Sequence, residues 1–144
     1  MIIGKATKRR RKFDVVIEAE FQPPHILLGN YLWDIGLPIE DFIELADQHH
    51  DARTQGTISG DSYRTVFAFD AVGIMSLYEP DEKKILSALT YVQLLKAWQQ
   101  AHDRFQVDQA LDQPIEIRIE ESLPRTESAD LARQQMEIAN QEML

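Results

Sequence analysis

The fold of this chain is indicated first by an alternating stretch, Phe13-Asp14-Val15-Val16-Ile17-Glu18-Ala19-Glu20-Phe21. Its odd-numbered positions are apolar, whereas Asp14, Glu18 and Glu20 are acidic. A period of two places the apolar side chains on one face of a β-strand and the carboxylates on the other. We therefore expect a half-buried strand with an acidic outer face over residues 13–21.

A basic run lies immediately before this strand. Six of the first twelve residues are basic and none is acidic, whereas the whole chain carries a formal net charge of −9. The remaining residues are therefore strongly acidic, and such a body repels phosphate and attracts basic surfaces. The run Lys8-Arg9-Arg10-Arg11-Lys12 leaves open an alternative, a small nucleic-acid-binding or regulatory adaptor. The run lacks the interleaved aromatic residues on which bases stack, so nucleic acid is the less favoured partner.

Further strands are indicated along the chain. Residues 62–70 and 114–120 also alternate, and apolar side chains on both faces of the first of these are typical of a central strand. Residues 72–78 are expected to continue the sheet after a turn. The apolar and aromatic residues 25–35 enclose Gly29-Asn30, and we expect one bent strand there, with two short strands around a turn as the alternative. Gly36 and Pro38 are expected to end this segment.

Two helices are predicted. Ile39, Phe42, Ile43 and Ala46 follow a helical spacing, which predicts a helix over 39–53. The segment Glu79-Pro80-Asp81-Glu82 is typical of a helix start, so we expect a long amphipathic helix over 81–105. A loop is expected around Gly56 and Gly60. The expected buried stripe of the long helix comprises Ile85, Ala88, Leu89, Val92, Leu95, Trp98 and Phe105.

Together these elements predict a single α+β domain over residues 1–124. We expect a mainly antiparallel sheet of four to five strands, with one face packed on the 81–105 helix. Residues 125–144 are polar, and a docked helix capped by Ser128 or a frayed tail both remain open. The weak apolar stripe of this segment comprises Leu131, Met136, Ile138 and Met143.

The composition and the distribution of apolar residues indicate the cellular compartment in which the protein is expected. The chain has no cysteine, which excludes disulfides, thiolate catalysis and cysteine-based zinc sites. Three carboxylates stand where a signal peptide needs its apolar core. No window approaches the roughly eighteen apolar residues that a membrane span needs. We expect a cytoplasmic protein that has no membrane partner.

No motif in the chain indicates catalysis, a metal or a cofactor. In Asp47-Gln48-His49-His50-Asp51 the adjacent histidines of a helix would point about 100° apart, which disfavours a shared metal ion. In Gly56-Thr57-Ile58-Ser59-Gly60 the serine falls one position too late for a nucleophile elbow. Glu18 and Glu20 share a strand face, which leaves open an enzyme with paired carboxylates, but nothing indicates an apolar pocket that would raise a pKa. We therefore expect no enzyme.

Three features of the N-terminal third form one pattern. They are Met1-Ile2-Ile3-Gly4, the strand that reaches Glu18, and Leu28-Gly29-Asn30-Tyr31-Leu32-Trp33-Asp34-Ile35-Gly36-Leu37-Pro38. This pattern resembles the start of small cytoplasmic immunity proteins of bacterial polymorphic-toxin and contact-dependent growth inhibition systems. In that family an apolar-aromatic strand, a turn and a proline follow the first strand. The resemblance covers about the first 40 residues and assigns no binding residue.

The resemblance implies that the protein neutralises a cognate toxin by tight one-to-one binding. Many such toxins are nucleases whose basic active sites bind phosphate, and an acidic body can mimic that phosphate and steer association. We expect the partner to be a basic C-terminal toxin domain, blocked at its active site or substrate surface. Charge and expected exposure suggest a contact set of Glu18, Glu20, Glu40, Asp41, Glu44 and Asp47.

Overall fold

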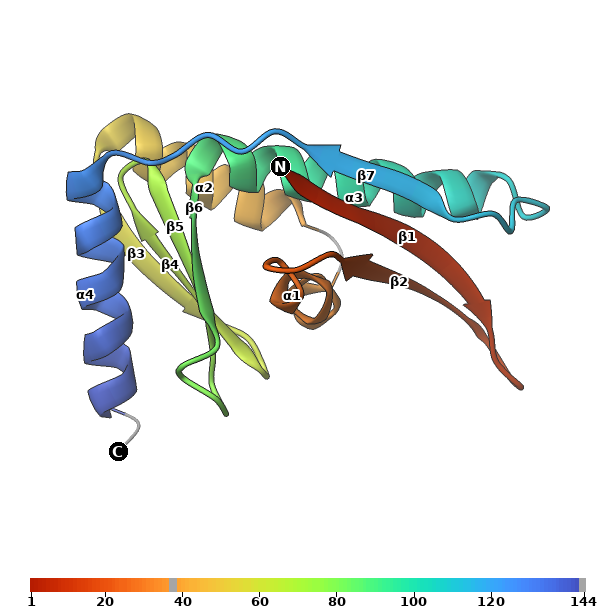
Figure 1. Cartoon of the computed structure of the whole chain (residues 1–144), viewed down its shortest axis with the longest axis horizontal. Helices are drawn as coiled ribbons and strands as arrows, with labels where there is room; N and C mark the ends of the chain where they lie inside the picture. The colour runs from red at the N-terminus through yellow and green to blue at the C-terminus, as the bar shows by residue number, and fades with distance from the viewer. Residues whose placement is uncertain (37–38, 143–144) are drawn as a thin grey trace.

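The structure, a computed structural model, describes residues 1–36 and 39–142 (Figure 1). Its strands form two antiparallel sheets, the three-stranded sheet A and the four-stranded sheet B. This architecture confirms the expected single-domain α+β fold with antiparallel strands packed against a long helix, but the strands form two sheets where one sheet of four to five strands was expected. Along the chain the elements are β1 (Ile2–Arg10), β2 (Val15–Phe21), α1 (Leu27–Ile35), α2 (Glu40–Ala52), β3 (Gln55–Ser59), β4 (Tyr63–Ala68), β5 (Ala71–Ser76), β6 (Lys83–Ser87), α3 (Ala88–Val107), β7 (Ile115–Ile119) and α4 (Thr126–Glu142).

Sheet A has the strand order β2-β1-β7. The predicted strands at 13–21 and 114–120 are confirmed as β2 and β7, but the expectation that the first strand begins at residue 13 is wrong. Most of the basic run belongs to β1, the central strand. Ile2 and Ala6 of β1 are fully buried, and pairing with both neighbours satisfies its backbone hydrogen bonds. The turn between β1 and β2 projects from the body, and Phe13 in it is 91% exposed (Figure 1).

Residues 25–35 were expected to form one bent strand, and this expectation is wrong because residues 27–35 form the helix α1. Tyr31 and Leu32 bury one side of this helix. Gly29 lies against the edge of β2, where a Cβ would stand 2.4 Å from the carbonyl oxygen of Ala19. A short apolar run does not distinguish helix from strand, so packing between β2 and sheet B decides the outcome (Figure 1). The helix ends at Gly36, which has a φ of 63°.

Sheet B has the strand order β3-β4-β5-β6. The strands predicted at 62–70 and 72–78 are confirmed as β4 and β5, and β4 is a central strand as expected. The loop expected around Gly56 is instead the edge strand β3, which pairs with β4. The absence of a side chain at Gly56 leaves room for the His49 ring, because a Cβ there would stand 2.4 Å from the imidazole Nε2.

The helix predicted over 81–105 begins later than expected. Residues 83–87 form β6, which pairs with β5 and completes sheet B. Within β6, the side chains of Ile85 and Leu86 point to opposite faces of sheet B and pack into different apolar clusters. This burial on both faces favours a strand over the helix that residues 79–82 predicted. Helix α3 starts after Ser87, whose Oγ accepts a hydrogen bond of 3.0 Å from the Thr90 N–H. Ile85 is therefore not in the helix.

The buried stripe of α3 is otherwise close to the prediction. Ala88, Val92, Leu95, Trp98 and Phe105 are buried as expected. Leu89 is the exception, because its side chain is 60% exposed. Helix α3 runs along both sheets, so a single helix supplies core residues to the two halves of the molecule (Figure 1).

The helices α2 and α4 confirm two expectations and correct one. Helix α2 matches the helix predicted at 39–53. Residues 126–142 form α4, which packs on the face of sheet B opposite α1 (Figure 1). Ser128 lies inside this helix, so it is not the cap, and Ile138 is 50% exposed. The contact of α4 with sheet B involves Ala132, Met136 and Ala139, together with the partly buried Leu131. The predicted roles of Pro38 and Met143 fall outside the described residues.

Among the described residues, buried apolar side chains form one large cluster and two small ones. The large cluster lies between sheet A, α1, α3 and one face of sheet B. The small clusters lie between α4 and the other face of sheet B, and include Val66, Met75 and Met136. Over residues 1–36 and 39–142, no helix is long and apolar enough to cross a membrane.

Candidate functional site

The six carboxylates of the expected contact set do not form one patch. Glu18 and Glu20 lie on β2, whereas Glu40, Asp41, Glu44 and Asp47 lie on α2. The two groups have different electrostatic surroundings, so they are described separately.

The β2 carboxylates lie beside cations of β1. Strand pairing places Lys5 opposite Glu20, and their charged groups are 3.9 Å apart. Arg9 lies opposite Val16, and its guanidinium donates diagonally to Glu18 at 2.6 Å. The acidic outer face expected for β2 is therefore matched by the basic run that precedes it in the sequence. Opposite charges that meet across two strands on a sheet surface contribute roughly 0.2–1 kcal/mol to strand pairing, and an incoming basic partner would compete with them.

The α2 carboxylates form a continuous exposed row. Glu40, Glu44, Asp47 and Asp51 follow each other at intervals of four, three and four residues, which places them on one face of the helix. We call these four residues the acidic stripe. The opposite face of α2 packs on the body through Ala46 and the partly buried residues Phe42 and Ile43. Asp41 is also exposed but lies beside the stripe.

The acidic stripe has few partners within the molecule. Among the described residues, no Lys, Arg or His lies within 4.0 Å of the carboxylates of Glu40, Glu44 or Asp47. Asp51 contacts the neighbouring His50 at 3.1 Å. Glu40 accepts a hydrogen bond of 2.6 Å from the Gln99 amide, and this bond lowers the pKa of the Glu40 carboxyl. The stripe is therefore exposed and accessible to a partner, and within the described residues only Asp51 has a cationic group nearby.

The cations of the basic run are divided by the alternation of β1. Lys5 and Arg9 point toward the β2 carboxylates, and Arg11 at the turn pairs with Asp14 at 2.7 Å. Lys8 and Arg10 point to the other face of sheet A, which is the face that carries α3. The run is therefore not one continuous basic surface, and only part of it faces any single direction.

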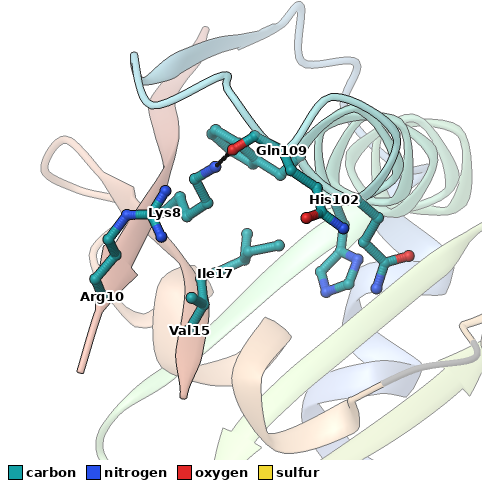
Figure 2. Close-up of a pocket in the computed structure, with 8 residues that line it drawn as sticks. Lys8, Arg10, Val15, Ile17, His102 and Gln109 are labelled. Atoms are coloured by element: carbon teal, nitrogen blue, oxygen red, sulfur yellow. Dashed lines mark hydrogen bonds between the residues drawn. The ribbon is translucent and has the colours of Figure 1, made fainter. Parts of the chain in front are cut away.

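Lys8 and Arg10 line a pocket of about 410 Å³ between the β1–β2 hairpin and the C-terminal end of α3 (Figure 2). The other described residues that line the pocket are Val15, Ile17, His102, Phe105, Gln106 and Gln109. The Lys8 Nζ donates a hydrogen bond of 2.9 Å to the carbonyl oxygen of Gln109. We call this cavity the hairpin pocket.

The histidines of α2 have structural contacts. The His49 ring stacks on Phe67 at 5.6 Å between ring centroids, and its Nδ1 lies 2.8 Å from the Thr54 hydroxyl. His50 points to Asp51 instead. In the described part of the chain, no three His, Asp or Glu side chains are placed so that they could hold a metal ion.

The two tryptophans differ in exposure. Trp98 is only 4% exposed and belongs to the core, as its place in the α3 stripe predicts. Trp33 on α1 is 59% exposed and lines a second, smaller pocket together with Ile17 and Trp98. Trp33 is therefore available to a partner at the rim of sheet A.

Sequence reasoning missed the hairpin pocket because it did not recognise β1 as a strand. The alternation of small or apolar residues with polar ones at Ile2, Gly4 and Ala6 was the available signal. That signal places Lys8 and Arg10 on the inner face of the sheet. The α3 side of the pocket carries no comparable signal, because His102 and Gln106 meet the hairpin only in the folded chain.

Comparisons of the chain with protein-family models, with curated proteins and with solved structures give no match.

Proposed function

We propose that this protein acts by binding and neutralising a basic protein partner, as expected of the immunity proteins that its N-terminal third resembles. The observation that supports the proposal is the acidic stripe of α2. The partner is a cognate toxin with a basic C-terminal domain, and the inhibitor and toxin meet in the cytoplasm. In this proposal the protein blocks the toxin's active site or substrate surface and catalyses no reaction itself.

The placement of the stripe supports a binding role. Like charges at a spacing of four residues destabilise a helix by roughly 0.2–0.5 kcal/mol per pair. Glu40 and Glu44 form one such pair, and Asp47 and Asp51 form another. A basic partner would remove this repulsion on binding, because its cations would lie between the carboxylates. The net charge of −9 would also speed the encounter of the two proteins at low salt.

Glu18 and Glu20 contribute less in this proposal than the sequence suggested. Their carboxylates already have Arg9 and Lys5 beside them, so a basic partner would have to compete with these internal cations. We therefore assign the main contact to α2, with Glu44 and Asp47 at its centre.

The test begins with capture of the partner. The tagged protein is used to recover binding partners from its own source at low salt and then at high salt. The proposal expects one stoichiometric, basic polypeptide that stays bound at high salt. Recovery of nucleic acid that is lost as the salt rises would instead support the adaptor alternative that uses residues 8–12, and would overturn the proposal.

Charge-reversed variants then locate the contact. The pair Glu44→Lys and Asp47→Lys changes the centre of the acidic stripe. The pair Glu127→Lys and Glu137→Lys makes the same change of net charge on exposed positions of α4. Calorimetric titration with the recovered partner should show at least a tenfold loss of affinity for the α2 pair only. An equal loss for both pairs would mean that net charge alone drives the binding, and would remove the stripe from the proposal.

A further inference from the structure

The hairpin pocket brings cationic side chains together on a face of the molecule that does not carry the acidic stripe. In the register of sheet A, Lys8 lies opposite Ile17 and Arg10 lies opposite Val15. These four side chains therefore share one face of the β1–β2 hairpin. The C-terminal part of α3 forms the facing wall. Figure 2 shows Lys8 and Arg10 on the hairpin side and His102 on the α3 side, with Ile17 between them.

The cations of this pocket differ from three other cations near the start of the chain. Lys5, Arg9 and Arg11 each lie beside a carboxylate. Among the described residues that line the hairpin pocket, none is acidic, and Arg10 has no ion-pair partner within the described part of the chain. Lys8 and Arg10 are two positions apart on one strand face, so their charges repel unless an anion lies between them.

Lys8 has one further role that sets the geometry of the site. The C-terminal end of a helix carries a partial negative charge, and Lys8 donates to the Gln109 carbonyl just beyond α3. The Lys8 ammonium also lies 5.8 Å from the centroid of the Phe105 ring. These contacts hold Lys8 in place and leave the exposed Arg10 guanidinium as the main group for an incoming anion.

The remaining lining residues point to the chemistry of the ligand. Val15, Ile17 and Phe105 form apolar wall, while Gln106 and His102 offer amide and imidazole groups. The His102 Nδ1 is buried and has no hydrogen-bond partner in the described part of the chain. A volume of about 410 Å³ lies within the range of small-molecule sites, roughly 300–1,000 Å³. A ligand that matches all these groups is small, anionic at one end and apolar at the other.

We propose that the hairpin pocket binds a small organic carboxylate, with the Arg10 guanidinium and the Lys8 ammonium on the carboxylate and an apolar body against Ile17 and Phe105. Arg10 can hold a carboxylate through two parallel N–H donors, a geometry that a single ammonium does not provide. This site is separate from the acidic stripe on α2, so its test is independent of the partner proposed above.

The experiment is a titration of the whole protein with benzoate at constant ionic strength, followed by two-dimensional amide NMR. Benzamide serves as the neutral probe of the same shape, and inorganic phosphate as the anion without an apolar body. We expect saturable shifts for residues of the hairpin and for His102 and Gln106, with a dissociation constant of the order of millimolar. Benzamide and phosphate should each bind at least tenfold more weakly.

Two variants carry the same change of charge. Arg10→Gln removes the proposed anion partner, whereas Lys12→Gln removes an exposed cation in the nearby turn. Benzoate should bind Arg10→Gln at least tenfold more weakly and Lys12→Gln as it binds the unmodified protein. An unchanged amide spectrum outside the hairpin shows that each variant is folded.

Four results would overturn the proposal. They are the absence of saturable shifts, equal weakening by both variants, binding of benzamide as tight as that of benzoate, and binding of phosphate as tight as that of benzoate. The third result would leave an apolar cavity, and the fourth would leave a general oxyanion site.

Discussion

Sheet A and sheet B differ in how they use their two faces. Sheet B is covered on both sides, so β4 and β5 bury Phe67 and Ile74 on one face and Val66 and Met75 on the other. Sheet A buries most of its apolar residues on the face toward α3, and its other face carries Val16 and the charged pairs Lys5–Glu20 and Arg9–Glu18. The comparison shows that strands covered by helices on both faces carry apolar residues on both faces, whereas strands covered on one face alternate between apolar and polar residues.

This difference also separates stability from binding in the molecule. Burial of apolar area is the largest favourable contribution to folding, so we expect sheet B, which is covered on both faces, to contribute more to stability than the exposed face of sheet A. The hairpin of sheet A projects from the body and carries both exposed charge and the hairpin pocket (Figure 1). Four predictions test this division.

The largest effect is expected from a truncation inside sheet B. Phe67 is 1% exposed and packs edge-on against the Tyr91 ring at 6.2 Å. Phe67→Ala should lower the free energy of unfolding by about 3–5 kcal/mol, because it leaves a cavity in the core. Val15→Ala on the 48% exposed edge of sheet A should change it by less than about 0.5 kcal/mol. Denaturant unfolding measures both, and similar losses would contradict the proposed difference between the sheets.

The second effect concerns the cover that α4 provides for sheet B. A Cβ at Gly73 would stand 3.0 Å from the Met136 Sδ and 3.2 Å from its Cε. Gly73→Val should therefore push α4 away and lower the free energy of unfolding by about 1–3 kcal/mol. Combining it with Met136→Ala should lower stability by less than the sum of the single changes. Strict additivity in this double-mutant cycle would show that the side chains at positions 73 and 136 do not interact.

The third effect is a loss of stability in acid that arises from His25 and His102. Burial lowers the pKa of His25, between β2 and α1, and of His102, on α3, and in both cases it outweighs nearby carboxylates. The unfolded chain therefore binds protons more readily than the folded one. The free energy of unfolding should fall as the pH drops below about 6.5, the ordinary imidazole value. His102→Gln should flatten this fall in pH-dependent unfolding, and an unchanged profile would remove His102 from the explanation.

The smallest effect is expected from the charged pairs of sheet A. Arg9 and Glu18 are both substantially exposed, so Arg9→Gln should lower the free energy of unfolding by about 0.2–1 kcal/mol. The loss should shrink in high salt, because screening weakens the pair that is removed. The matched change Lys12→Gln should have a smaller effect. A loss of several kcal/mol for Arg9→Gln would mean that the outer face of sheet A supports the fold more than the comparison allows.

The elements that could be predicted from the sequence are those with a clear periodic pattern of apolar residues. The period of two in 13–21, 62–70 and 114–120 identified β2, β4 and β7, and the helical spacing at 39–53 identified α2. The segments at 25–35 and 83–87 were misassigned for a shared reason. Their apolar residues fit helix and strand about equally well, and contacts with β2 and with β5 decide between the two.

The candidate sites were predictable to different degrees. The acidic stripe follows from residue spacing within one helix, so Glu40, Glu44 and Asp47 were within reach of the sequence. The contacts of Glu18 with Arg9 and of Glu20 with Lys5 were not, because they depend on the pairing of β1 with β2. The hairpin pocket needed both that pairing and the position of α3, so its residues could not be grouped from the sequence.

By itself, the sequence determined the α+β class, the helix α2 and the strong net negative charge. It also determined the strands β2, β4 and β7 through their alternation of apolar and polar residues. Only the tertiary structure decided which carboxylates lie beside internal cations, which remain available, and which cations face a pocket. The physical reason is the range of the interactions. Periodicity acts over neighbouring residues, whereas the hydrogen bond from Lys8 to the Gln109 carbonyl joins residues 101 positions apart in the chain.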